Sequence, residues 1–145
     1  MTFAHPLIGL ILGKEFGHVT AYVAGSVFPD IDHLVVLIKN KHYHPLEAYR
    51  AMKDEKKYGE SYKTVFTHSI LAWLIFFGSL FLINRGAGLA FGTGYFIHLI
   101  LDAVDTDEKQ YFYPLKFKFT GFLPVFSYFE ILSTIILVGI YLFTK

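Results

Sequence analysis

The sequence predicts an all-α fold: a small multi-pass bundle of membrane helices with an N-terminal helical hairpin and three long spans. Of the 145 residues, 54% are hydrophobic and only 17% are charged. The apolar residues are grouped in long runs, a pattern typical of membrane-spanning helices. Histidine and aspartate residues lie at or near the ends of these runs, where ionisable groups are costly and are usually functional.

Composition also limits the partners and the chemistry of the chain. The formal net charge is only +1, so the chain lacks the basic excess that neutralises nucleic-acid phosphates, and we expect no nucleic-acid partner. The sequence contains no cysteine, which excludes disulfides and thiolate ligands. A bound metal would therefore use imidazole and carboxylate groups. For this length we expect one domain, 1–145.

The first 38 residues favour a helical hairpin over the alternative of one broken helix. The apolar runs 6–13 and 19–28 are each too short to cross a bilayer alone. The glycine-rich segment 13–17 permits a reversal between them. Arms of similar length would bring His5 back beside Asp30. No basic residue precedes the first run, so we expect no cleavable signal.

Three longer apolar runs are predicted to span the membrane: 65–83, 87–104 and 122–143. At about 1.5 Å per residue, the first would extend roughly 28 Å, close to the thickness of the hydrocarbon core. The first run contains His68, the second contains His98 and Asp102 near its C-terminal end, and the third contains Glu130. Glu130 needs a polar partner, which the sequence does not identify.

The polar stretch 39–63 separates the hairpin from the three runs and carries more basic than acidic residues. The positive-inside tendency therefore predicts that it is cytoplasmic. The run 65–83 would lead outward, residues 84–86 would form an outer turn, and 87–104 would return inward. His68, His98 and Asp102 would then reach the cytoplasmic side of the membrane together.

Two local patterns suggest a metal site at that level. His98 and Asp102 are four residues apart, so on a helix their side chains lie on one face. In the second pattern, Pro29 is expected to end a helix and to leave Asp30, Asp32 and His33 in the following turn. The alternative is that Asp32 or His33 only caps the next helix or supports a ligand.

His68 and His5 are candidate metal ligands because they are expected at the same membrane depth as the other candidates. His68 follows Thr67, the expected N-cap of its helix, and each histidine alone would be unremarkable. The remaining histidines are left out of the site, because His18 lies at the hairpin corner and His42 and His44 lie in the polar stretch. Aromatic residues near the ends of the runs, at 111–113 and 117–122, predict an interfacial belt.

The order of these motifs resembles a known family. The motifs are an N-terminal histidine, Pro-Asp-x-Asp-His, Thr67-His68-Ser69, His-x-x-x-Asp and a downstream Pro114. In this order they resemble the YdjM-like family, which is described as LexA-regulated, inner-membrane, metal-dependent hydrolases. The resemblance covers about residues 5–114. It implies an inner-membrane location and a metal site formed by His5, Asp30, Asp32, His33, His68, His98 and Asp102.

Two positions depart from the family pattern. Lys63 to Phe66 stand where relatives often have His-Arg-Gly before Thr-His-Ser. Asp105 and Glu108 stand where a threonine and a glycine are usual. Asp105 is a possible added ligand, and metal or substrate preference is expected to differ from that of relatives.

A cysteine-free site of this kind suits Zn²⁺, with Mn²⁺ or Fe²⁺ as alternatives. Seven candidates exceed the needs of one tetrahedral ion, so we expect one or two ions, the second case with a bridging carboxylate such as Asp30. Asp32 or Asp105 would be the general base. The predicted function is hydrolysis of a lipid ester or phosphoester at the membrane interface. The alternatives are divalent-metal transport or sensing and a scaffold with a structural metal.

Overall fold

The computed structural model describes residues 4–39, 41, 43–44, 46–47, 50, 65–124 and 127–144. Its regular elements are α1 (Ala4–Phe16), α2 (Val19–Val27), the 3₁₀-helix η1 (Phe28–Asp30), α3 (Ile31–Lys39), α6 (Ile70–Ile83), α7 (Arg85–Val104) and α8 (Tyr128–Phe143). Within the described ranges, the only β-type pairs are two isolated bridges. The predicted all-α class is confirmed. Most of the predicted polar stretch 39–63, with His42, lies outside the described residues.

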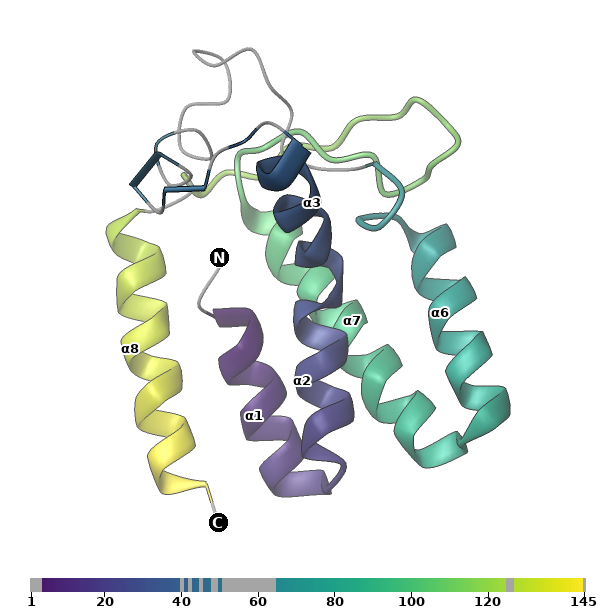
Figure 1. Ribbon diagram of the computed structural model, residues 1–145. Helices are drawn as coiled ribbons and strands as arrows, with labels where there is room; N and C mark the ends of the chain where they lie inside the picture. The colour runs from purple at the N-terminus through teal and green to yellow at the C-terminus, as the bar shows by residue number, and fades with distance from the viewer. Residues whose placement is uncertain are drawn as a thin grey trace.

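The predicted N-terminal hairpin is present. α1 and α2 run side by side in opposite directions (Figure 1). The chain reverses at Gly17 and His18, whose φ angles of 78° and 57° lie in the left-handed region that glycine adopts without steric cost. The two helices pack closely, because a side chain at Gly9 would overlap Ser26 and the backbone of Val23.

α2 ends at Val27, just before the 3₁₀-helix that contains Pro29, as predicted, but the chain stays helical beyond the proline. Pro29 occupies the first turn of η1, and the chain continues through η1 into α3. Proline is compatible with the start of a helical segment, because its fixed φ suits that position and its missing N–H is not needed there. The resulting stretch Val19–Lys39 has 21 residues and is long and apolar enough to span a membrane.

α7 is the central helix of the bundle and is the second helix of spanning length, with 20 residues. It packs against α2, α6 and α1. Contact with α2 is close, because a side chain at Gly25 would overlap the backbone of Phe91 and one at Gly94 would overlap the backbone of Tyr22. Asn84 ends α6 and caps α7 by accepting a hydrogen bond from the Ala87 N–H at 3.0 Å.

Two of the three predicted long spans are shorter than expected, so the prediction of three long spans was wrong. α6 has 14 residues because Ser69, not Thr67, is its N-cap, and Ser69 Oγ accepts a hydrogen bond from the Ala72 N–H at 3.2 Å. α8 has 16 residues because it begins only at Tyr128, and it packs on α1. Both remain apolar helices.

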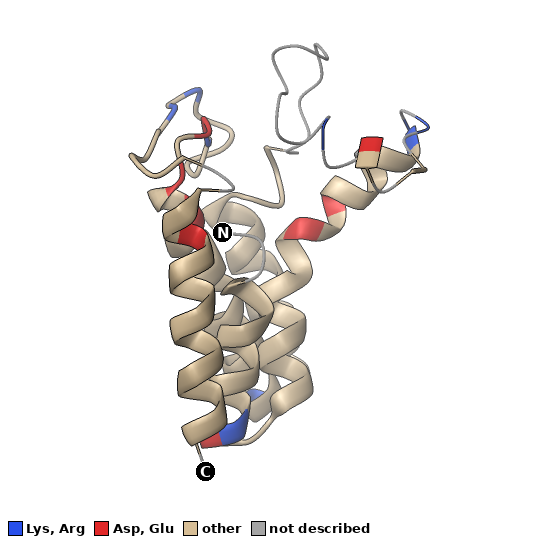
Figure 2. Cartoon of the chain, turned by 90° about the vertical axis from the view of Figure 1, so that its left-hand side faces the viewer, with Lys and Arg blue, Asp and Glu red and all other residues tan. Residues whose placement is uncertain are grey.

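Four segments that are far apart in the sequence meet at one end of the bundle. The N-terminus of α1, the η1–α3 junction, the N-terminus of α6 and the C-terminus of α7 all lie there (Figure 1). The segment 105–124 also lies at this end and is tied by the bridges Asp105–Leu123 and Lys109–Phe119. Charged residues of the described chain gather near the two ends of the bundle, whereas the middle of the helices carries none (Figure 2).

Candidate metal centre

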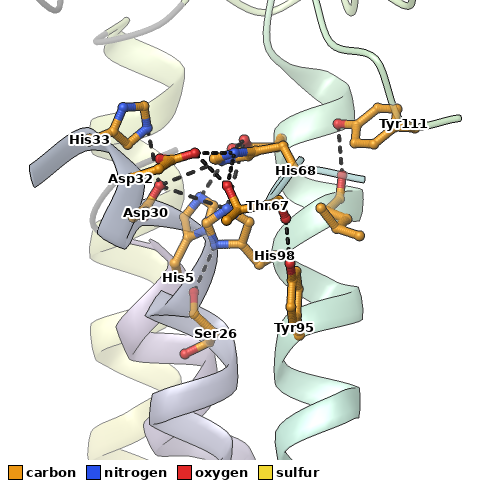
Figure 3. Close-up of polar contacts among 12 residues, drawn as sticks. His5, Ser26, Asp30, Asp32, His33, Thr67, His68, Tyr95, His98 and Tyr111 are labelled. Atoms are coloured by element: carbon orange, nitrogen blue, oxygen red, sulfur yellow. Dashed lines mark hydrogen bonds and ion pairs between the residues drawn. The ribbon is translucent and has the colours of Figure 1, made fainter. Parts of the chain in front are cut away.

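The structure brings together six of the seven residues that the sequence suggested as metal ligands (Figure 3). They fall into three overlapping groups, in each of which one ligand atom per residue lies within 4.8 Å of the others. The groups are His5, Asp30 and His98; Asp30, His33 and His68; and His68, His98 and Asp102. Asp30, His68 and His98 each belong to two groups, so the three groups form one continuous cluster.

His98 presents one ring nitrogen to the middle of this cluster. Its Nδ1 lies 2.8 Å from the carbonyl oxygen of Ser26 and also contacts Nδ1 of His5. Because the carbonyl can only accept, we assign the proton to Nδ1 of His98, and Nδ1 of His5 is then the second acceptor. Nε2 of His98 is buried and makes no hydrogen bond with any described part of the chain. It lies 3.8 Å from Oδ1 of Asp30 and 3.8 Å from Oδ2 of Asp102. The second nitrogen of this ring is therefore available as a metal ligand.

His68 repeats this arrangement from the turn before α6. Its Nδ1 lies 3.2 Å from Oδ2 of Asp32, an acceptor that again places the proton on Nδ1. Its Nε2 is also buried, and among the residues that the structure describes it has no hydrogen-bond partner. That atom lies 3.5 Å from Oδ2 of Asp102 and 4.0 Å from Oδ1 of Asp30. Two imidazole nitrogens and two carboxylates thus face the same space.

This donor set fits a divalent cation. Ligands bound to zinc at about 2.0–2.2 Å in a tetrahedron lie about 3.4 Å apart. The histidine–aspartate separations here are 3.5–4.0 Å, although Asp30 and Asp102 belong to different groups of neighbouring ligand atoms. Buried lone pairs that face anionic oxygens without a hydrogen bond are unfavourable unless a cation or a proton lies between them. If Nε2 were protonated instead, the same residues would form histidine–aspartate ion pairs.

His5 and His33 lie on either side of these four residues. His5, in the first turn of α1, packs its ring against His98 with the ring centroids 3.8 Å apart. Its Nε2 lies 3.5 Å from Oδ1 of Asp102. His33 Nε2 lies 3.4 Å from Oδ1 of Asp30. Asp30 thus takes part both in the His5 group and in the His33 group.

Asp32 belongs to none of the three groups and contacts His68 from outside. Its Oδ2 accepts a hydrogen bond from the Thr67 hydroxyl and faces Nδ1 of His68. The Tyr95 hydroxyl in turn donates to the Thr67 carbonyl. Sequence reasoning missed these roles of Thr67 and Tyr95. The only sequence signal was the position of Thr67 directly before a candidate ligand.

Comparison with known families decides the assignment of the chain. The family model of the YdjM inner membrane protein matches residues 2–145. The chain belongs to the YdjM inner membrane protein family. It is therefore an inner membrane protein, consistent with two helices of spanning length among the described residues. No curated protein and no solved structure gives a significant match.

In this YdjM family member the cluster lies near the middle of the Val19–Lys39 stretch and in the second half of α7. Asp30 follows Val19 by eleven residues and His98 follows Arg85 by thirteen, which at about 1.5 Å per residue places them roughly 17 and 20 Å along their helices. The Val19–Lys39 and Arg85–Val104 stretches both continue beyond the cluster. Three other cluster residues lie at helix ends: His5 in the first turn of α1, His68 just before α6 and Asp102 in the last turn of α7.

The other polar residues considered in the sequence lie elsewhere. Asp105 is in none of the groups, although it is buried at the C-terminal end of α7, and this burial raises the pKa of its carboxyl above the usual range. Glu130 is buried in the first turn of α8. His18 is exposed at the opposite end of the bundle, and His44 is exposed in a short described fragment of the polar stretch.

Proposed function

We propose that this YdjM family member is a membrane-bound, metal-dependent hydrolase that cleaves a lipid ester or phosphoester at the membrane interface. The observation that carries the proposal is the pair of Nε2 atoms of His68 and His98. Both are buried, make no hydrogen bond within the described residues and face the carboxylates of Asp30 and Asp102. A structural histidine usually satisfies both ring nitrogens when it is buried.

The proposed metal ligands are His68, His98, Asp30 and Asp102, with Zn²⁺ as the first choice and Mn²⁺ or Fe²⁺ as alternatives. His5 and His33 would extend the set to a second ion. A divalent ion held there would supply Lewis acidity toward an ester or phosphoryl oxygen.

The residues behind the histidines would fix their orientation. The Ser26 carbonyl holds the proton of His98 on Nδ1, and the Asp32 carboxylate does the same for His68. Partners of this kind keep a histidine in the tautomer and rotation that a metal needs. We therefore propose that Asp32 positions His68 and is not the general base. Asp105 stays the proposed base.

The depth of the cluster supports a lipid substrate. The ester and phosphate groups of membrane lipids lie at the boundary between hydrocarbon and headgroups, and we place the cluster at this level because His5, His68 and Asp102 lie at the ends of α1, α6 and α7. We propose that this end faces the cytoplasm, because the predominantly basic stretch 39–63 adjoins it in the sequence. A soluble substrate would gain nothing from a centre at this depth.

Metal transport or sensing receives less support. A transport path needs polar groups across the bilayer, whereas beyond the cluster α2 and α7 close on each other. Gly25 packs against the Phe91 backbone and Gly94 against the Tyr22 backbone. Transport would appear as flux of divalent metal into liposomes that contain the protein.

The test is hydrolysis of phospholipids and lipid phosphates by the full chain in nanodiscs, after removal of metal and reloading with Zn²⁺ or Mn²⁺. We expect product release that depends on metal and is lost in Asp30→Asn. His18→Ala, an exposed histidine at the other end, is the matched control and should keep the wild-type rate. Equal rates in wild type and Asp30→Asn, or no hydrolysis with either metal, would contradict the proposal.

A further inference from the structure

Two of the three ligand groups share one histidine and differ in burial. The group of Asp30, His33 and His68 is named the outer position, and the group of His68, His98 and Asp102 is named the inner position. The side chains of Asp30 and His33 are 24% and 14% exposed, whereas those of the other three residues are at most 7% exposed. The cluster is therefore accessible at the outer position and closed at the inner one.

His68 lies between the two positions. Its ring centroid is 5.7 Å from that of His33 and 5.5 Å from that of His98. Its Nε2 lies 4.0 Å from Oδ1 of Asp30, on the outer side, and 3.5 Å from Oδ2 of Asp102, on the inner side. An imidazole nitrogen offers one lone pair, so Nε2 can bind only one ion at a time. With respect to His68, the two positions are alternatives for the same ion.

The outer position is also nearer to the end of the bundle where the four segments meet. The chain runs toward that end through η1 and α3, and His33 follows Asp30 by three residues, a rise of roughly 4.5 Å. Figure 3 shows His33 at the outer edge of the cluster and His98 deeper among the helices. A hydrated cation that arrives from this end would meet the outer position first.

We propose that Asp30 and His33 form an entry position, from which a divalent ion passes through His68 to the inner position. An ion is costly to bury unless protein groups replace its water, and this carboxylate and imidazole offer such groups where the cluster is accessible. Asp30 also faces His98 at 3.8 Å and so reaches both positions, whereas His33 belongs to the outer position alone. The inference rests on the metal centre of the proposed function and adds the route by which the first ion is loaded.

His33→Ala separates an entry role from that of a permanent ligand. The full chain in detergent receives half an equivalent of Zn²⁺, and rapid mixing with a chromophoric chelator measures the rate of zinc release. Mixing metal-free protein with the zinc–chelator complex measures the rate of entry, and equilibrium competition measures the affinity. A residue on the route that is absent from the final position changes both rates by one factor, because affinity depends only on the end states. Leu34→Ala, at the exposed neighbouring residue, is the matched control for a disturbance of α3.

We expect His33→Ala to slow entry and release together by at least about tenfold, with an affinity within about threefold of wild type, because loss of one group near a metal site typically has effects of about 10–100-fold. Leu34→Ala should keep both wild-type rates. Faster release with weaker binding would make His33 a permanent ligand and would overturn the proposal. Rates that are unchanged, or faster in both directions, would also overturn it, because His33 would then not carry the ion.

No substrate is present in this experiment, so its result is separate from that of the hydrolysis assay. The expected kinetics without hydrolysis would refute only the proposed activity. Hydrolysis by a chain whose His33→Ala variant keeps wild-type zinc kinetics would refute only the entry position.

Discussion

Oδ2 of Asp32 lies 3.2 Å from Nδ1 of His68, and Nε2 on the opposite side of that ring faces Oδ2 of Asp102 at 3.5 Å. The carboxylate thus holds the imidazole with one nitrogen protonated and the other directed into the cluster. The Thr67 hydroxyl completes this arrangement by donating to the same Asp32 oxygen. Asp32 and Thr67, from two segments of the chain, therefore set the orientation of one candidate ligand.

Thr67→Val is predicted to weaken zinc binding without removing a ligand. Loss of the hydroxyl leaves Asp32 less constrained, and loss of such a supporting contact typically costs about 10–100-fold in metal affinity. Competition with a chromophoric chelator measures the change. Thr67→Ser keeps the hydroxyl and should bind within about threefold of wild type, a rescue that a packing effect of the methyl group would not give. Wild-type affinity in Thr67→Val would show that the hydroxyl does not support His68.

Asp30→Asn is predicted to reduce metal content more than His33→Ala does. Asp30 takes part in two of the ligand groups, whereas His33 takes part in one. Equilibrium dialysis against Zn²⁺, followed by elemental analysis, compares the number of ions bound per chain. The same loss in both variants would rule out a shared role for the Asp30 carboxylate.

Gly25→Ala is predicted to destabilise the bundle by about 1–3 kcal/mol, the usual cost of inserting a group into a packed interface. The new methyl group would overlap the Phe91 backbone and force α2 and α7 apart. Gly78→Ala on α6 is the matched control, because a side chain there meets nothing within 4 Å. Glycine inside a helix costs roughly 0.5–1 kcal/mol relative to alanine, so the control should be neutral or stabilised. Reversible unfolding in mixed detergent micelles measures both, and equal stabilities would contradict the packing.

Asp105→Asn is predicted to raise stability at neutral pH. Burial raises the folded-state pKa of Asp105, so the native state binds the proton more tightly than the unfolded state does. The ionised carboxylate therefore destabilises the fold as pH rises above the unfolded value of about 3.8. Thermal unfolding at pH 7 and at low pH should show an advantage for the variant that shrinks as the pH falls. If Asp105 is the base, the same variant should bind metal normally and lose turnover.

The sequence contained enough information to predict which residues meet, because apolar runs of known length place their ends at common depths. His5 could be brought beside Asp30 in this way, since the hairpin arms have similar lengths. It was also possible to separate His18 from the cluster, because a residue at the hairpin corner lies at the other end of the arms. Depth along a helix follows from counting residues.

The direction in which a side chain points around its helix cannot be found by counting residues unless the first residue of the helix is known. Thr67 and Ser69 are both good N-caps, and only the structure shows that Ser69 starts α6. Thr67 is thereby left to contact Asp32. Likewise, α3 begins at Ile31 and not after His33, so Asp32 and His33 point in directions about 100° apart. One contacts His68 from outside the cluster, and the other joins it.

The most direct test of a metal centre is the metal content of the full chain, purified in detergent without chelators and measured by elemental mass spectrometry. We expect about one or two equivalents of zinc, manganese or iron per chain, with at least one equivalent lost in His98→Ala and in Asp102→Ala and none lost in His18→Ala. A wild-type protein without metal, or a content unchanged in both cluster variants, would contradict the account and leave the histidine–aspartate cluster as a network of buried ion pairs.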